Sequence, residues 1–311
     1  MIKVTLTNEI LKRISEIDEN RFSLSTIELP PVTKNRLRKN SKKKSSYASN
    51  KIEGNPLTEK QASEAIDSEP HKHFLKPEQE VRNYFLALNL LEKKLKKKEF
   101  FSKEMILEVQ AMVEKGAGKE KIGLRGPMPP GVLFAVYDSE TGVPEYIPPE
   151  YIDIPVLLDE LVEYVNTTDD HPLIIAAVVH HQLVTIQPFE EGNGRTARLM
   201  SGYILDYYGY GFNGIGSLEE YFAYDPDEYY ASLQMGLPAL YYSGRENPPH
   251  PEIWINYFLK MMGLCSKKVY ELSKASEKDE LEGSLSYLNT KEKEFLVFLL
   301  KKRLYEFTPI E

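Results

Sequence analysis

The residues of this chain best suited to chemistry lie between positions 186 and 198, which read IQPFEEGNGRTAR. Gly192 and Gly194 let backbone N–H groups turn toward one point, and the helix expected to follow carries partial positive charge at its N-terminus. Both features favour an anion such as phosphate. Glu191 precedes the glycines and offers the hard oxygen ligands that Mg²⁺ prefers. The segment therefore predicts a site for a metal–polyphosphate.

Two arginines extend this predicted site. Arg195 and Arg198 are three residues apart in the sequence. On the expected helix this spacing places both side chains on one face. We therefore expect the two guanidinium groups to reach the same ligand.

The segment resembles the core motif of the Fic family, which reads His-Pro-Phe-x-Asp/Glu-Gly-Asn-Gly-Arg-x-x-Arg. Every fixed position matches except the first, where Gln187 stands in place of the catalytic histidine. A Gly-Asn-Gly-Arg sequence alone could be a plain helix cap, but the complete motif in register argues against that. The resemblance implies ATP as substrate and Mg²⁺ held by Glu191. The nucleotide-binding residues that it implies are Gly192, Asn193, Gly194, Arg195, Arg198, Tyr229 and Tyr230. For the two tyrosines, ordinary core packing is nearly as good an explanation.

The resemblance also implies a reaction, in which a protein Ser, Thr or Tyr hydroxyl attacks the α-phosphate of ATP and AMP remains on the target. The motif histidine removes the hydroxyl proton. The amide of Gln187 has no basic lone pair near neutral pH, and general-base assistance is worth roughly 10²–10⁴-fold. We therefore expect a protein adenylyltransferase of low activity. A nucleotide-binding pseudoenzyme with a regulatory role, or a transferase of another phosphate-containing group, stays open, as does whether Gln187 is native or engineered.

A second motif lies upstream, at Ser49, Glu53 and Gly54. Ser49 and Glu53 are four residues apart and share a helix face, and Gly54 ends that helix. Autoinhibited Fic proteins carry such a motif, and the resemblance implies that Glu53 pairs with Arg198. The carboxylate would then take a donor intended for the γ-phosphate. A merely exposed glutamate would be unfavourable at a helix C-terminus.

The elements that position these motifs are predicted to be helices, so the fold class is mainly α, and the resemblance implies a Fic-fold helical bundle with a small β-hairpin flap. Apolar residues recur at helical spacing over residues 8–22 and 77–98. Pro30 and Pro31 precede a very basic helix that begins near residue 34, and Gly54 ends it. Thr58 and Gln61 have the spacing of a capping box that opens the next helix.

The hairpin is predicted from β-like residues 132–137 followed by a turn at residues 138–142. A hairpin in a helical domain can be mere decoration. The resemblance implies instead a flap that holds a target protein by strand pairing. The flap residues are Val132, Leu133, Phe134, Ala135 and Val136.

Three regions are expected along the chain. Residues 1–75 form an N-terminal helical region that contains the inhibitory motif at 49–54, and residues 76–245 form the Fic core. Residues 246–311 form a C-terminal helical extension whose end looks like the first helix of a winged-helix module, too short to complete one. Whether the chain is truncated at its C-terminus therefore stays an open question.

Composition narrows the class of protein. The chain has 311 residues, a net charge of −8 and a pI near 5.5, which argues against nucleic acid as a partner unless a winged helix is completed. The basic run at residues 34–44 is interpreted as a solvated helix face. One cysteine, Cys265, agrees with a reducing compartment. No apolar run reaches 18 residues, and no signal peptide is visible. We expect a cytoplasmic protein without membrane contact, and a homodimer stays open.

Overall fold

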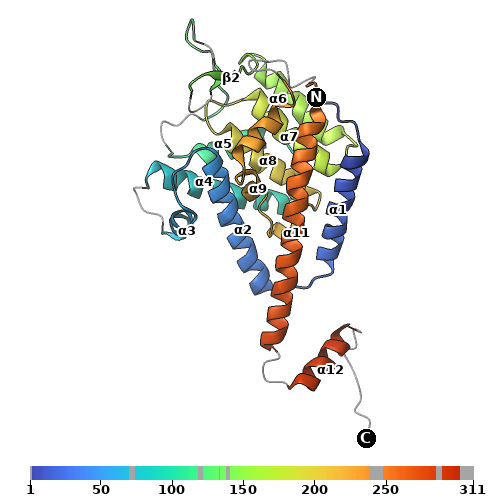
Figure 1. Ribbon diagram of the computed structural model, residues 1–311. Helices are drawn as coiled ribbons and strands as arrows, with labels where there is room; N and C mark the ends of the chain where they lie inside the picture. Colours follow the sequence, from blue (N-terminus) through green and yellow to red (C-terminus); the bar gives the residue numbers. More distant parts are fainter. Residues whose placement is uncertain are drawn as a thin grey trace.

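The computed structural model describes residues 2–69, 74–117, 122–132, 134–137, 141–237, 248–284 and 289–301. Within these ranges the chain is mainly α-helical, as predicted (Figure 1). The helices are α1 (Asn8–Ser25), α2 (Pro31–Ile52), α3 (Glu59–Asp67), α4 (Lys76–Lys96), α5 (Lys103–Glu114), α6 (Ile154–Thr167), α7 (Pro172–Ile186), α8 (Asn193–Tyr207), α9 (Glu219–Phe222), α10 (Pro226–Gln234), α11 (Pro251–Ser284) and α12 (Thr290–Lys301). The short 3₁₀ helix η1 (Phe212–Gly214) follows α8, and strands β1 (Val136–Tyr137) and β2 (Pro144–Tyr146) precede α6.

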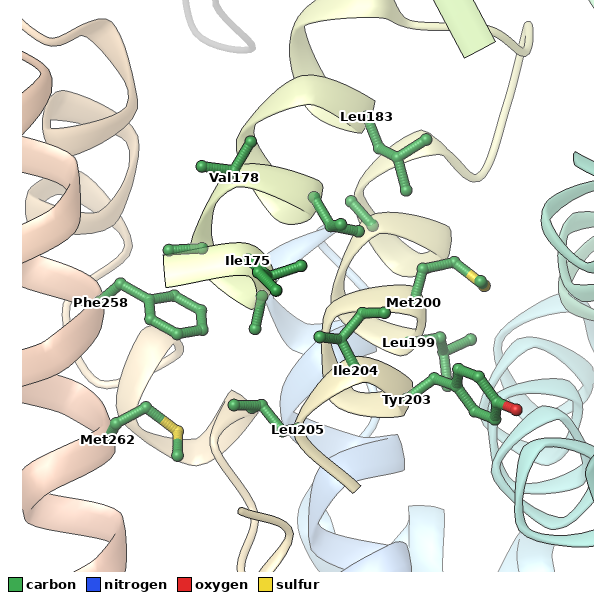
Figure 2. Close-up of a cluster of buried hydrophobic side chains, with 14 of the residues drawn as sticks. Ile175, Val178, Leu183, Leu199, Met200, Tyr203, Ile204, Leu205, Phe258 and Met262 are labelled. Carbon is green, nitrogen blue, oxygen red and sulfur yellow. The ribbon is translucent and has the colours of Figure 1, made fainter. Parts of the chain in front are cut away.

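The centre of the fold is the pair α7 and α8. Every residue of α7 from Leu173 to Leu183 is buried, which identifies a helix surrounded by protein on all sides. Figure 2 shows Ile175 of α7 between Phe258 of α11 and Ile204 of α8. Burial of such side chains stabilises the fold by about 1.5–3 kcal/mol each. The two helices that flank the motif are therefore held rigidly.

The other helices surround this centre. Helix α1 runs alongside α11, whereas α2 lies against α4 and α9 (Figure 1). One buried cluster includes Ile10 of α1, Leu199 of α8 and Trp254 of α11, so it draws on all three regions expected from the sequence. The division into those regions stays a prediction. None of the described helices is long and apolar enough to span a membrane.

In the N-terminal region, the predicted end of the basic helix before Gly54 is confirmed, whereas its predicted start near residue 34 is wrong, because proline is accepted at the first position of a helix. Helix α2 begins at Pro31 and ends at Ile52, and Gly54 follows with φ +79°, a conformation that glycine adopts without strain. The capping box between Thr58 and Gln61 is present at the start of α3. Helix α2 therefore stops where Glu53 can turn inward.

The predicted flap strand is wrong in length. Strand β1 contains Val136, but Val132, Phe134 and Ala135 lie in no strand, and Leu133 lies outside the described residues. Gly131 has φ +80°, which bends the chain away from strand geometry, and the Phe134 ring lies 4.5 Å from the Arg125 guanidinium. The hairpin itself is present.

The hairpin pairs Val136 with Tyr146 and Tyr137 with Pro144, with an irregular register between the two pairs. Pro144 has no N–H to donate to the ladder, which limits how far the pairing can extend. Residues 138–140 of the predicted turn lie outside the described part of the chain.

Candidate active site

The motif forms the loop between α7 and α8, and Asn193 fixes its shape. The Asn193 side chain accepts a hydrogen bond from the Phe189 N–H at 3.0 Å and donates one to the Phe189 carbonyl at 2.8 Å. The Phe189 ring is fully buried. Gly192 precedes α8 in the left-handed conformation, with φ +82°. The loop is therefore fixed by the hydrogen bonds between Asn193 and Phe189 and by the conformation of Gly192. The first N–H groups of α8 lie beside it.

Gln187 ends α7 in the left-handed conformation, with φ 47° and ψ 60°. Its side-chain Nε2 donates to the carbonyl of Val184 at 2.9 Å. This bond satisfies one of the carbonyls left free at a helix C-terminus. The amide thus caps its own helix, although Gln187 also borders the cavity described below.

Arg125 holds the same loop from outside, and sequence reasoning missed it. Its Nε donates to the Gln187 carbonyl at 2.7 Å, and its backbone N–H donates to the Pro188 carbonyl at 2.9 Å. The guanidinium also donates to the Pro149 carbonyl. Burial lowers the pKa of Arg125. The contact spans 62 residues of sequence, so no local spacing could have identified it.

A cavity of about 320 Å³ opens beside the loop, and we call it the motif cavity. This volume lies within the range typical of small-molecule sites. The lining residues are Glu53, Val136, Tyr146, Val184, Thr185, Gln187, Glu190, Glu191, Gly192, Asn193, Gly194, Arg198, Tyr229, Tyr230, Leu233, Gln234 and Leu237. The structure therefore brings together most of the residues that the motif predicted, and Arg195 is not among them.

Arg198 is the most heavily bonded side chain of this cavity. Its Nη2 donates to a Glu53 carboxylate oxygen at 2.6 Å and to the Ser49 carbonyl at 2.9 Å, and its Nε donates to the Ser49 hydroxyl at 2.8 Å. Both Ser49 and Arg198 are buried. Bonds of this kind, between charged partners, are shorter and stronger than neutral ones. The donors of Arg198 that face α2 are therefore already taken.

The electrostatics of Arg198 favour its charge strongly. Burial alone would lower the pKa of the guanidinium, but Glu53, Tyr229 and Tyr84 outweigh that effect and raise it. The neighbouring His180 responds in the opposite way, since burial and the Arg198 charge depress its pKa well below the usual value. The site thus combines one permanent cation with neutral aromatic partners.

The Glu53 carboxylate also occupies the space beside Gly194. A Cβ atom placed on Gly194 would lie 2.4 Å from Glu53 Oε1 and 3.2 Å from Arg198 Nη1. The carboxylate is therefore in contact with the backbone of the first turn of α8, where an anion is favoured. A side-chain anion fills the place that the sequence predicted for phosphate.

Arg195 differs from the expectation that both arginines reach one ligand. Its Nη2 lies 2.8 Å from Glu114 Oε1 on α5, and its side chain is only 6% exposed. Glu80 on α4 lies 4.0 Å away. Because α8 is surrounded by protein, a shift of three residues turns the side chain toward a different neighbour. Arg195 therefore braces α8 against α5, while Arg198 faces the cavity.

Glu191 is exposed and lines the motif cavity. Its backbone carbonyl accepts a hydrogen bond from Gln110 at 3.3 Å. The described residues contain no group of three or more metal-ligating side chains. Mg²⁺ is commonly bound by one or two carboxylates together with substrate phosphates. The Glu191 carboxylate fits an ion that arrives with a polyphosphate.

The two tyrosines play different parts. Tyr229 is buried, and its hydroxyl lies 3.0 Å from His180 Nε2 and 3.4 Å from Arg198 Nη1. Tyr230 is 48% exposed and lines the cavity. His181 reaches α10 instead of the motif loop, because its Nε2 donates to the Leu233 carbonyl at 3.3 Å. Tyr230 and Leu233 both line the motif cavity, whereas Tyr229 is part of the core.

Part of the chain is similar to proteins of a known family. Residues 100–205 match the model of the Fic/DOC family. The protein adenylyltransferase Fic of Drosophila mojavensis is 28% identical over 204 residues, which cover 64% of this chain and 38% of the relative. The protein of the same name from Nematostella vectensis is 29% identical over 199 residues, covering 62% and 44% of the two chains. This chain therefore spans less than half the length of these curated relatives.

The fold agrees with this match. The crystal structure of a Fic family protein from Desulfovibrio desulfuricans G20 superposes with a TM-score of 0.70, at 22% identity, covering 88% of this chain and 77% of that one. The complete motif, the matched residues 100–205 and the shared helical fold agree with one another. Residues 100–205 therefore match the Fic/DOC family model, and the described part of the chain shares its helical fold with a Fic family protein.

Proposed function

We propose that this protein is a Fic-type protein adenylyltransferase held in an inhibited state by Glu53, and that Gln187 keeps its turnover low. The observation that carries the proposal is the 2.6 Å contact between Glu53 and Arg198 beside the N-terminus of α8. The relatives named as adenylyltransferases support the reaction type. The proposed substrate is ATP, and the proposed acceptor is a hydroxyl group of a target protein.

In this proposal, different residues of the motif cavity bind the phosphates, the adenine, the metal ion and the target segment. The N–H groups at the start of α8 and the guanidinium of Arg198 bind phosphate oxygens. Tyr230 and Leu233 flank the adenine. Mg²⁺, held by Glu191, would neutralise phosphate charge when it is bound. The hairpin of β1 and β2 lies at the rim through Val136 and Tyr146, so a target segment that pairs with it would enter beside the phosphates.

Inhibition follows from competition for the same donors. While Glu53 contacts Arg198 and the backbone at Gly194, the γ-phosphate of ATP meets a negative charge in the place where it should bind. ATP must then displace the carboxylate or bind in a pose unsuited to in-line attack. Ser49 strengthens the inhibited arrangement, because it gives Arg198 two further acceptors.

A second function, a nucleotide-binding regulator without turnover, is favoured by Gln187 itself. Its amide is bonded to the Val184 carbonyl and carries no base. A regulator of this kind needs only the exchange between Glu53 and phosphate at Arg198. The two functions differ in whether any AMP is transferred.

The decisive experiment compares the chain with Gln187→His, using labelled ATP, Mg²⁺ and a cell lysate. Histidine tolerates the left-handed conformation found at this position. We expect AMP transfer, to a target or to the chain itself, to rise at least about tenfold, because a general base is restored. Gln234→His is the matched control, since it adds an imidazole elsewhere on the same cavity. An absence of labelling by all three proteins would exclude the adenylyltransferase and leave the regulator.

A further inference from the structure

A second cavity, of about 340 Å³, lies on the far side of Arg198, and we call it the rear cavity. Its walls come from α2, α4, α8, α11 and the segment that follows α8. Among the described residues Arg198 is the one side chain that lines both cavities. Leu88, Leu205, Phe212 and Met262 give the rear cavity mainly apolar walls.

Most polar groups on these walls already have partners. Lys42 donates to Glu92 at 2.5 Å, and Ser45 donates to Glu219 at 2.8 Å. The Ser41 hydroxyl donates to the Gly216 carbonyl at 2.5 Å, and Arg38 Nε donates to the Asn213 carbonyl at 2.5 Å. The charges of Lys42 and Glu92 therefore cancel, and they do not call for a ligand.

Asp206 is the exception. Its carboxylate makes no hydrogen bond or ion pair within the described part of the chain, although it lines the cavity. Asp206 is exposed, because the cavity opens onto its side chain. Burial and the charges of Glu219 and Glu92 raise the pKa of Asp206 to about 7, against the opposing effect of Lys42 and Arg38. A carboxylate without a partner beside apolar walls suits a ligand that brings both a positive charge and an apolar body.

The rear cavity also touches the inhibitory helix. Arg38, Ser41, Lys42 and Ser45 recur at helical spacing and line the cavity from one face of α2. One turn further along that face is Ser49, whose hydroxyl and carbonyl hold Arg198. A molecule in the rear cavity would therefore contact both the helix that presents Glu53 and the arginine that Glu53 occupies.

We propose that the rear cavity is an effector site for a small organic cation, an ammonium group on an apolar body, with the ammonium at Asp206 and the body against Leu205 and Met262. The cavity is lined by the face of α2 that leads to Ser49, so a ligand that holds this face in place favours the arrangement in which Ser49 and Glu53 contact Arg198. Occupancy therefore favours the inhibited state and weakens ATP binding. This second effect rests on the proposed function, whereas the binding site itself does not.

The site is tested with benzylammonium as the probe on the full chain at pH 8, with affinity measured by calorimetry. Benzyl alcohol has the same body without the charge, and the ammonium ion has the charge without the body. We expect benzylammonium to bind at least about fivefold more tightly than either. Binding should weaken as the pH falls through about 7, since protonation removes the charge of Asp206. Equal affinities for benzylammonium and benzyl alcohol would overturn the site.

Two variants locate the probe. Asp206→Asn keeps the size of the side chain and should abolish the preference for benzylammonium, whereas Asp169→Asn removes an exposed aspartate elsewhere and should change nothing. An Asp206→Asn protein that keeps the preference would overturn the assignment. Thermal unfolding confirms that each variant is folded.

The regulatory effect has its own readout. Saturating benzylammonium should lower ATP affinity in the unaltered chain but not in Glu53→Gly, where the competing carboxylate is absent. If benzylammonium binds through Asp206 and ATP affinity does not change, the effector role is overturned and the site stands. If neither protein binds ATP, the proposed function fails while the binding test remains readable.

Discussion

Glu53 and Arg198 are 145 residues apart in the sequence, and their side chains meet at 2.6 Å on the wall of the motif cavity. The Arg198 side chain is 1% exposed, whereas that of Glu53 is 31% exposed. The arginine is therefore fixed by the core, and the glutamate, at the end of α2, is the partner that can leave. This asymmetry is what a reversible occupant of a phosphate site requires.

The first prediction concerns this contact. Glu53→Gly should raise ATP affinity roughly ten- to a hundredfold, because a charge-assisted bond worth about 1.5–3 kcal/mol no longer competes for Arg198. Calorimetric titration with ATP and Mg²⁺ measures the ATP affinity of the variant and of the unaltered chain. The measurement does not depend on turnover, so Gln187 does not interfere with it. Glu53→Gln, which keeps the size and loses the charge, should give an intermediate gain. Unchanged affinity in both variants would remove the inhibitory role of Glu53.

The second prediction concerns the metal. Glu191→Ala should reduce the Mg²⁺-dependent part of ATP affinity at least roughly tenfold, since even indirect disturbance of a metal site has an effect of that size. ATP titrations in the presence of Mg²⁺, with and without EDTA, give the part of the affinity that depends on Mg²⁺. The neighbouring Glu190→Ala is the control, because Glu190 lines the same cavity. If both variants lose the Mg²⁺ dependence equally, the ion is held by general negative charge and not by Glu191.

The local part of the fold was predictable from the sequence, and the reasons are physical. Pro31, Gly54 and the Thr58–Gln61 capping box act on the backbone within a few residues, so their effects on helix boundaries can be seen in the sequence itself. The pairing of Glu53 with Arg198 was expected from the resemblance and is present in the structure. Its inhibitory role stays a prediction, like the division of the chain into three regions.

What sequence reasoning missed depends on contacts between distant segments. The spacing of Arg195 and Arg198 indicates adjacent positions on a helix, but not which neighbour each side chain meets. Arg195 pairs with Glu114, which is 81 residues away in the sequence. Arg125 likewise holds the loop from a segment with no regular pattern. The flap strand was overestimated because β-branched residues favour strands only where a partner strand is available.

The third prediction follows from the pair of Arg195 and Glu114. Glu114→Ala should lower the free energy of unfolding by about 3–5 kcal/mol, because a buried charge loses its partner. Urea denaturation measures this. Glu108→Ala on the same helix removes a glutamate that is 50% exposed and paired with Lys94, and it should cost under about 1 kcal/mol.

A double-mutant cycle separates this pair from simple packing loss. Arg195→Ala combined with Glu114→Ala should cost clearly less than the sum of the single changes. Additive costs would mean that the two side chains stabilise α8 independently. ATP should bind the folded Glu114→Ala protein with nearly unchanged affinity if Arg195 is a brace and not a phosphate ligand.

The last prediction concerns acid stability and His181. Burial lowers the pKa of His181 to about 4 in the folded protein, from an ordinary value of 6.5. Between these two pH values the unfolded chain binds a proton at His181 that the folded chain does not bind. The contribution of His181 to the free energy of unfolding is therefore fully present above pH 6.5 and decreases as the pH falls toward 4. The loss reaches at most about 1.4 kcal/mol per pH unit for this group. His180 acts in the same direction, because its pKa is also depressed by burial.

His181→Phe replaces the imidazole by another aromatic ring. The change removes the titratable group and the N–H that donates to the Leu233 carbonyl. It should cost about 1–3 kcal/mol at pH 7 and make stability less dependent on pH between 6.5 and 4. Urea denaturation across this range measures both effects, with His250→Phe as the control because that side chain is 58% exposed. A His181→Phe protein with the original pH dependence would show that His181 is not the group that takes up the proton. Because Leu233 lines the motif cavity, the same variant should weaken nucleotide binding at pH 7, where the titration plays no part.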